Sequence, residues 1–328
     1  MGQPVIPPNP PRTSLEGKTC LITGANTGIG FETARQMLTL KASRVIITAR
    51  DKSKGQHAVA ALCQDPEVVA ANPSARIEMF HLDLDDYHSG LALCDQVKRE
   101  VPDLDVLLCN GGMNIMSYQE SKNGHEQVMQ VNCYTHFLIV LELLPLLQAT
   151  AVKRKSPSRV TFVGSGTQYH HTLTKAPLAD NENVLSHYDD TKIYHGLQRY
   201  SDSKLVVNAF IRRLARIVSD SEVIVNNFCP GLVETTGFDR GIPRWLKIIM
   251  YVYRGTSSRP LKHAGWTAIY ATAVSGRESH GKFMQSNKID PGPPFLNQPA
   301  GNDFLERLWT DFVADVAPLD PKLKPFAH

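Results

Sequence analysis

The chain has 328 residues and a mass of 36.4 kDa, with 42% hydrophobic residues, which is enough to bury one large core or two modest ones. Lysine and arginine total 35 against 32 aspartates and glutamates, and the charges are spread along the chain, which argues against a nucleic-acid partner. The longest apolar stretch, residues 137–147, is shorter than the ~18 residues of a membrane span and contains Glu142 and Pro145, so we expect no integral membrane segment.

The N-terminal segment, residues 1–14, is rich in proline and has no apolar run typical of a signal peptide. We therefore expect an extended arm followed by a single domain over residues 15–328. No Cys-x-x-Cys pair occurs, and Cys20, Cys109 and Cys229 lie beside strand-like runs, where a thiol behaves as a small hydrophobe. Reduced cysteines and the absence of a signal sequence predict a cytoplasmic protein.

Short runs of β-branched residues alternate with segments of helical periodicity along most of the chain. The predicted strands are residues 19–23, 44–48, 76–81, 106–109, 159–163 and 223–227, and the predicted helices are 29–39, 54–63, 91–99, 126–147 and 200–218. Such alternation requires parallel pairing with right-handed crossovers. The fold class predicted is α/β, with a single doubly wound, Rossmann-type parallel sheet flanked by helices.

Three stretches interrupt this alternation and predict added surface: an insertion at 168–198, a substrate-lid lobe at 234–262 and a C-terminal extension at 287–328 with an amphipathic segment at 304–313. The first insertion contains His170, His171, His187 and His195. Their spacing does not place two imidazoles on one helix face beside a carboxylate, so we expect solvated histidines and no metal site. The Asp189-Asp190 pair is similarly interpreted as a solvated turn.

A glycine-rich turn, residues 23–30, follows the first predicted strand and leads into a helix. Glycines at such a turn let the backbone approach a diphosphate, whose charge then meets the unpaired N–H groups at the start of the helix. A turn of this kind can also be a plain tight connection. Its place after the first strand of an alternating chain favours a dinucleotide site.

The spacing T-G-x-x-x-G-x-G resembles that of the short-chain dehydrogenase/reductase family. Tyr200-Ser-Asp-Ser-Lys204 matches the family's Y-x-x-x-K motif, Ser165 follows a strand as its serine does, and Asn132 lies on a helix where its asparagine lies. Further marks are Asp83-Leu84, Asn110-Gly111-Gly112, and Pro230-Gly231 with Thr235. The chain departs from the family in having Cys109 before Asn110, Gly111 for the alanine of N-N-A-G, and Gly164 before Ser165.

This resemblance implies a catalytic set of Asn132, Ser165, Tyr200 and Lys204. Ser165 would polarise the substrate oxygen, Tyr200 would exchange the proton, Lys204 would hold the nicotinamide ribose, and Asn132 would complete a water relay. The implied cofactor-binding residues are Gly24, Asn26, Thr27, Gly28, Ile29, Gly30, Arg50, Lys54, Asp83, Leu84, Asn110, Gly111, Tyr200, Lys204, Pro230, Gly231, Val233 and Thr235.

The pairing of Tyr200 with Lys204 also has a physical basis that needs no family. Positions i and i+4 of one helix project from the same face. An adjacent ammonium favours the phenolate, so we expect Lys204 to lower the pKa of Tyr200 from its ordinary value near ~10. Taken alone, this spacing would indicate a surface tyrosine beside a solvated lysine. The catalytic interpretation is favoured because the glycine-rich turn occurs in the same chain.

The end of the second predicted strand indicates which nicotinamide cofactor is bound. An acidic residue there would bind the ribose hydroxyl of NAD, but the chain has Ala49 and Arg50, and a guanidinium suits a 2′-phosphate. Asp51 is interpreted as the N-cap of the following helix. The Arg50-Asp51-x-x-Lys54-Gly55 pattern resembles the retinol-dehydrogenase-like branch of the family, so NADP(H) is expected, with Lys54 assisting.

The segment 245–253 carries three aromatic residues where the family places a substrate lid. Trp245 and Tyr251, with Ser165, are expected to contact a bulky lipophilic ketone, aldehyde or alcohol. A dimer interface ranks second for this segment and a membrane contact third, because nine residues cannot span a bilayer and Lys247 alone is a weak basic face.

The expected activity is that of an NADP(H)-dependent carbonyl reductase or alcohol dehydrogenase, of the kind found in fungal natural-product (secondary metabolite) biosynthesis. Two alternatives remain open at this point: a redox-neutral dehydratase, isomerase or cyclase of the same family, and a non-enzymatic dinucleotide sensor. The family often forms homodimers or homotetramers through the helices that contain Asn132 and Tyr200, so a homo-oligomer is possible.

Overall fold

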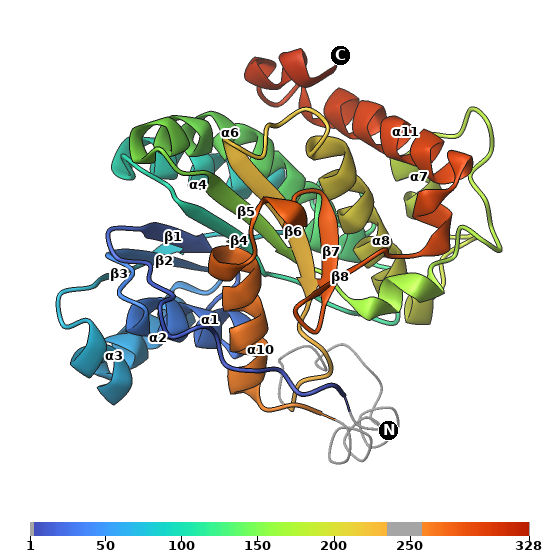
Figure 1. The fold of residues 1–328 in the computed structure, drawn as a ribbon. Coiled ribbons are helices and arrows are strands. Elements are labelled where there is room, and N and C mark those ends of the chain that lie inside the picture. Colours follow the sequence, from blue (N-terminus) through green and yellow to red (C-terminus); the bar gives the residue numbers. More distant parts are fainter. Residues whose placement is uncertain (1–2, 235–257, 328) are drawn as a thin grey trace.

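The protein is built around one eight-stranded sheet in the order β3-β2-β1-β4-β5-β6-β7-β8 (Figure 1). The computed structural model describes residues 3–234 and 258–327. The strands are β1 (Thr19–Ile22), β2 (Arg44–Ala49), β3 (Arg76–His81), β4 (Val106–Cys109), β5 (Ser158–Val163), β6 (Val223–Cys229), β7 (Lys282–Gln285) and β8 (Lys288–Asp290). The strand order reverses between β1 and β4, which is where doubly wound sheets hold ligands.

The six strands predicted from the sequence are confirmed, and all of them pair in parallel. β7 adds a further parallel strand beside β6, and β8 pairs with β7 in the antiparallel direction. Strands β1, β2, β4 and β6 are buried along their whole length, as expected where helices cover both faces of a sheet. The predicted doubly wound α/β fold is therefore correct.

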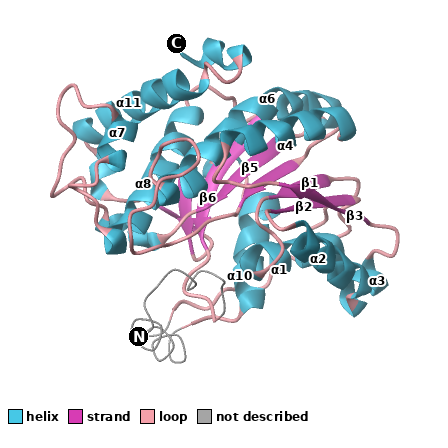
Figure 2. Cartoon of the chain, turned by 180° about the vertical axis from the view of Figure 1, so that it is seen from behind, coloured by secondary structure: helices cyan, strands magenta, loops and turns pink. Residues whose placement is uncertain are grey.

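Helices cover both faces of the sheet (Figure 2). They are α1 (Gly28–Thr39), α2 (Lys52–Gln64), α3 (Pro66–Ala71), α4 (Tyr87–Glu100), α5 (Gln127–Met129), α6 (Thr135–Arg154), α7 (Val184–Asp189), α8 (Gly196–Leu214), α10 (Leu261–Ile269) and α11 (Pro299–Val316). One core lies under α4, α6, α8 and α11, where Phe137 stacks on Phe210 at a centroid distance of 3.8 Å. A second core lies under α1 and α10 on the other face.

Aspartate caps begin three of the helices. Asp51 accepts a hydrogen bond from Lys54 N at the start of α2, and Asp86 does the same for His88 N at the start of α4. Asp65 caps α3, where Pro66 occupies the first helical position. The interpretation of Asp51 as an N-cap is confirmed.

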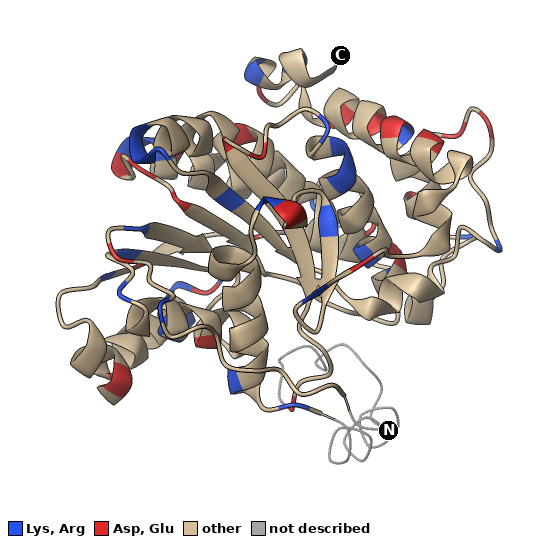
Figure 3. Ribbon diagram, viewed as in Figure 1, with Lys and Arg blue, Asp and Glu red and all other residues tan. Residues whose placement is uncertain are grey.

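The helical run at 127–154 is long and apolar enough to cross a bilayer, and 72% of its most apolar window is buried inside the protein. It contains a π-helical turn, η1 (Gln130–Tyr134), between α5 and α6. Figure 3 shows the positions of Lys and Arg interspersed with those of Asp and Glu over the described part of the chain, in agreement with the even distribution of charge in the sequence.

The structure differs from the sequence prediction mainly near the C-terminus. Helix α11 is much longer than the predicted segment 304–313, because Pro299 starts it and Phe304, Trp309 and Phe312 pack into the main core. The β7–β8 hairpin was not predicted. Its strands have only four and three residues, and its turn consists of Ser286 and Asn287 at positive φ, a weaker signal than Asn-Gly.

The insertion at 168–198 is more closely packed than the sequence suggested. His187 and His171 are buried, so the expectation of solvated histidines is wrong for these two, while His170 and His195 are exposed. His187 is held by a 2.8 Å contact between its Nδ1 and Glu182. The helix α7 buries an apolar face against α11, which a polar sequence with few apolar positions did not indicate.

A partly buried polar network joins this insertion to the C-terminal helix. His125 lies between Asp189 of α7, at 2.8 Å from Nδ1, and Asp315 of α11, at 3.1 Å from Nε2. Tyr87 donates a further hydrogen bond to Asp315. Asp189 is therefore a partner of His125 rather than part of a solvated turn. Burial lowers the pKa of His125, but the two carboxylates outweigh it and raise that pKa to about 9.

We expect this network to make stability depend on pH. The pKa of His125 is higher in the folded chain than its ordinary value of 6.5, so the stabilisation is complete below about pH 6.5 and is lost as the pH rises through about 9. His125→Gln should lower the free energy of unfolding by about 2–3 kcal/mol at pH 6, and by much less at pH 10. Urea unfolding of both proteins at the two pH values measures this, and an equal difference at both would contradict it.

Candidate active site

The loops that follow the parallel strands carry the predicted site residues to one edge of the sheet. Gly24 follows β1, Arg50 follows β2, Asp83 follows β3, Asn110 follows β4, Ser165 follows β5 and Pro230 follows β6. Because these strands are parallel, their carboxyl ends share an edge, where open α/β sheets bind ligands. The topology thus gathers residues that are far apart in the sequence.

The turn between β1 and α1 is shaped by glycine. Gly24 has a φ of +61°, and a Cβ there would lie 2.7 Å from the Cα of Gly111 in the loop after β4. Asn26 and Thr27 complete the turn, and residues 28–30 form the start of α1, where Thr27 makes no side-chain cap. The first N–H groups of α1 and the positive end of its dipole are the groups predicted to meet the diphosphate.

Thr23, the first residue of the glycine-rich turn, joins this turn to the loop after β4, a role that the turn's sequence did not indicate. Its Oγ1 accepts hydrogen bonds from the backbone N–H groups of Asn110, at 2.8 Å, and Gly111, at 3.0 Å. The same oxygen lies 2.8 Å from Nε2 of His136. Burial, reinforced by the Lys204 ammonium, lowers the pKa of His136 to about 3, so its imidazole is neutral. The position of His136 four residues after Asn132, on the same helix face, was the available signal.

Tyr200 and Lys204 lie together on α8, with Nζ of Lys204 5.3 Å from the centroid of the Tyr200 ring. Lys204 is buried and donates a 2.8 Å hydrogen bond to the carbonyl of Val163 at the end of β5. Ser165, just beyond that strand, interacts with the Tyr200 side chain and also accepts hydrogen bonds from Thr167. The structure brings these three predicted residues into one cluster.

The pKa of Tyr200 differs from the sequence expectation. Burial raises it well above its ordinary value, with a smaller contribution from Cys229, and the interaction with Ser165 offsets only part of this. Burial also lowers the pKa of Lys204 to about 8. The predicted lowering of the Tyr200 pKa by Lys204 is therefore wrong, because desolvation of the phenol is the dominant effect.

Asn132 lies in the π-helical turn η1 and holds another loop in place. Its amide donates to Met113 O and to Ser203 Oγ, both at 3.0 Å, and its oxygen accepts from Met113 N at 2.8 Å. Both amide hydrogens are thus engaged by protein groups. The side chain links the loop after β4 to α8, and the use of Asn132 to hold a water stays a prediction.

The ends of β2 and β3 carry the remaining charged candidates. Arg50 is exposed, and among the described residues nothing forms an ion pair or hydrogen bond with its side chain. Lys54 is also exposed, with Nζ 3.8 Å from Asp51. Asp83 pairs with Lys122 at 2.9 Å, and Leu84 packs against Gly111.

Beyond β6, Pro230 is buried, and Val233 forms an isolated parallel bridge with Arg259. Sγ of Cys229 accepts hydrogen bonds from Gly166 N at 3.3 Å and Gly231 N at 3.4 Å, and so joins the loops after β5 and β6. The predicted residues Thr235, Trp245 and Tyr251 lie outside the described residues, as does most of the predicted lid.

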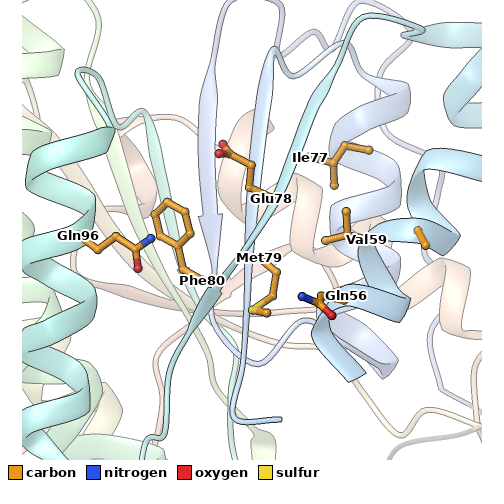
Figure 4. Close-up of a pocket in the computed structure, with 8 residues that line it drawn as sticks. Gln56, Val59, Ile77, Glu78, Met79, Phe80 and Gln96 are labelled. Atoms are coloured by element: carbon orange, nitrogen blue, oxygen red, sulfur yellow. The ribbon is translucent and has the colours of Figure 1, made fainter. Parts of the chain in front are cut away.

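Two cavities lie away from this cluster. A groove of about 410 Å³ runs along the edge strand β3, between Val59 of α2 and Gln96 of α4, and is lined by Met79 and Phe80 (Figure 4). A larger one, of about 660 Å³, lies between the N-terminal arm and the β7–β8 hairpin. Neither contains a predicted site residue. In the described ranges, no group of three or more His, Cys, Asp or Glu side chains is arranged to hold a metal ion.

Comparison with known proteins agrees with this geometry. Residues 18–174 match the family model described as short chain dehydrogenase. The chain is 51% identical over 292 residues to the short chain dehydrogenase sor7 of Hypocrea jecorina, covering 89% of this chain and 81% of that protein. It is 37% identical over 318 residues to the short chain dehydrogenase macD of Penicillium terrestre, covering 97% and 96%.

The chain belongs to the short-chain dehydrogenase family. Its fold also resembles that of Pseudomonas aeruginosa RhlG, solved as an NADP active-site complex, with a TM-score of 0.63, 23% identity, and coverage of 83% of this chain and 95% of that one. A Mycobacterium paratuberculosis protein gives a TM-score of 0.67 at 20% identity, with coverage of 92% and 94%. Membership places this chain in a family of oxidoreductases that bind a nicotinamide dinucleotide.

Proposed function

We propose that this short-chain dehydrogenase is an NADP(H)-dependent carbonyl reductase, or alcohol dehydrogenase in reverse, for a bulky lipophilic ketone, aldehyde or alcohol. The observation that carries the proposal is the cluster of Ser165, Tyr200 and Lys204 at the same sheet edge as the glycine turn. The fit with a dinucleotide is supported by the cradle at Gly24, which a Cβ would fill. The aromatic sequence at 245–253 supports the lipophilic substrate class.

A bound nicotinamide would supply the hydride to the carbonyl carbon, or accept it from that carbon in the reverse reaction. The chain's own residues manage the oxygen: Ser165 donates a hydrogen bond to it, and Oη of Tyr200 gives its proton to it during reduction or takes that proton during oxidation. The buried phenol, with its raised pKa, is protonated at neutral pH and is ready to act as the acid. Lys204 lies beside the ring; during reduction its ammonium would replace the proton and regain one from solvent through the water relay expected at Asn132.

The preference for NADP(H) is proposed from Arg50. The exposed guanidinium at the end of β2 suits bidentate binding of a 2′-phosphate, and Asp51 is engaged as the cap of α2 rather than presented to a ribose hydroxyl. The NADP complex of the structurally similar RhlG agrees with this choice. Lys54, exposed on the first turn of α2, would add positive charge near the same phosphate.

Arg50→Ala is expected to raise the Kd for NADPH by about 10- to 100-fold, the effect of losing hydrogen bonds from a charged group, and to leave the Kd for NADH within about 2-fold. Fluorescence titration with each nucleotide measures both constants. Lys52→Ala, an exposed cation on the same turn, is the matched control and should change neither. If Arg50→Ala weakened the binding of NADPH and NADH equally, Arg50 would not be the residue that recognises the 2′-phosphate.

The activity itself is tested by mixing the purified protein with NADPH and a panel of lipophilic ketones and following the loss of NADPH absorbance. Ketone-dependent consumption with formation of an alcohol supports the proposal. Conversion of a substrate without net consumption of NADPH would instead identify a redox-neutral member of the family. If neither NADPH nor NADH binds, the proposal fails.

A further inference from the structure

The N-terminal arm crosses the segment that follows β6 and binds its backbone. The side-chain amide of Gln3 makes a two-way contact with Leu232: Nε2 donates to Leu232 O at 2.8 Å, and Leu232 N donates to Oε1 at 2.9 Å. Gln3 and Leu232 are 229 positions apart in the sequence. A primary amide matches one residue's N–H and C=O pair, so this contact fixes the position of Leu232.

Glycine at position 231 is required by this contact. Gly231 has a φ of +79°, and a Cβ there would collide with Oε1 of Gln3 and lie 2.8 Å from Cζ of Arg259. The arm therefore lies directly against the Pro230-Gly231 turn. Ile6, three residues further along the arm, is only 1% exposed and anchors the arm to the body of the protein.

Arg259 gives the arm a second attachment. The residue is 6% exposed, and Nη2 donates to the carbonyl of Pro4 at 3.4 Å. Nε and Nη1 have no hydrogen-bond partner among the described residues, so the Pro4 carbonyl is the one described acceptor for this buried guanidinium. Removal of the arm would leave the buried guanidinium of Arg259 without this acceptor, which is unfavourable for a buried charged group.

The arm and Arg259 occupy one edge of the segment and leave the other edge to Val233. Arg259 N donates to Leu232 O, and Glu234 N donates to Arg259 O. The carbonyl of Leu232 and the N–H of Glu234 therefore point to the same edge of the segment, which is also the edge that Gln3 contacts. Since consecutive residues of an extended segment direct their N–H and C=O groups to opposite edges, those of Val233 face away from the arm.

We propose that Gln3 is a positioning residue of the cofactor site: it holds residues 230–234 in place, and with them the predicted cofactor-binding residues Pro230, Gly231 and Val233. This inference rests on the proposed function, because it requires a nicotinamide cofactor at that site. Gln3 acts through Leu232 and does not itself touch the reacting atoms. The arm is thus part of the cofactor site rather than a spacer before the domain.

The test compares Gln3→Ala with Val5→Ala, a control in the same arm whose side chain is 89% exposed. Loss of the two hydrogen bonds should raise the Kd and the KM for NADPH by about 10-fold and change kcat by less than about 2-fold. Val5→Ala should match the wild type in all three. Hydrogen exchange of the cofactor-free protein should be faster at the Leu232 amide in Gln3→Ala only.

A merely structural role would lower the melting temperature and kcat without this selective effect on NADPH, and that pattern would overturn the proposal. Tighter NADPH binding by Gln3→Ala would also overturn it, because the arm would then oppose the cofactor. If the wild type binds neither nucleotide, the proposed function fails. If it binds NADPH and Gln3→Ala binds it equally well, only the role of Gln3 fails.

Discussion

Tyr200→Phe is expected to lower kcat/KM for ketone reduction by about 1,000-fold and to leave the Kd for NADPH within about 2-fold of the wild type. The substitution removes only the oxygen that exchanges a proton with the substrate. The ring is retained, and so is its packing beside Lys204, whose Nζ lies 5.3 Å from the ring centroid. Steady-state kinetics and a nucleotide titration on the same preparation measure the two quantities.

Tyr194→Phe is a suitable control for this experiment. Tyr194 lies just before α8, and its hydroxyl donates a 3.4 Å hydrogen bond to Ile115 O, so its loss removes a hydroxyl near the same helix without touching the Ser165 cluster. We expect Tyr194→Phe to retain at least about half of the wild-type activity. Substantial turnover by Tyr200→Phe would exclude the proposed proton transfer.

Much of the fold was predictable because its central strands are short apolar runs between helical segments. The parallel order then determines the site, since the loops at the ends of β1, β4, β5 and β6 must share one edge. Gly24 and Ser165 each lie just beyond the end of a strand, β1 and β5, and Tyr200 lies on α8, the helix between β5 and β6. Strand position and motif spacing were therefore sufficient to bring these residues together.

Other features depend on contacts that local sequence does not encode. Two examples are the hydrogen bonds between Gln3 and Leu232 and those between the Asn132 amide and Met113. Both join residues that only the tertiary fold brings together. The direction of the Tyr200 pKa shift depends on how deeply the phenol is buried, which the i, i+4 spacing with Lys204 cannot indicate. For the same reason His187, in a polar stretch, was wrongly expected to be solvated.

The helix that carries Tyr200 is fixed by a buried charge cluster beside it. Arg199 is 2% exposed, and its guanidinium lies 3.6 Å from Glu126 and 3.9 Å from Asp202. It also lies over the rings of Tyr188, at 5.1 Å, and Tyr194, at 5.2 Å. Because Arg199 directly precedes Tyr200, the same contacts set the rotation of α8 and hence the direction of the phenol.

Arg199→Ala is expected to lower the free energy of unfolding by about 3–5 kcal/mol, because it leaves the buried carboxylates of Glu126 and Asp202 without their cation. Burial already raises the pKa of Glu126 to about 7, and Arg199 opposes that rise. Without the arginine the pKa rises further above the ordinary value of 4.5, so the variant loses stability as the pH increases from about 4.5. The deficit relative to wild type should therefore be larger at pH 8 than at pH 5.

Urea unfolding at both pH values tests this expectation, with Arg216→Ala as the control. Arg216 is 47% exposed and pairs with Glu306, which is also largely exposed, so its loss should cost less than about 1 kcal/mol at either pH. If Arg199→Ala lowered the free energy of unfolding no more than the control does, the prediction would be wrong, and neighbouring groups would have to compensate the charges of Glu126 and Asp202. A large deficit that does not change with pH would place the stabilisation in the packing of Arg199 against Tyr188 and Tyr194 instead of in its charge.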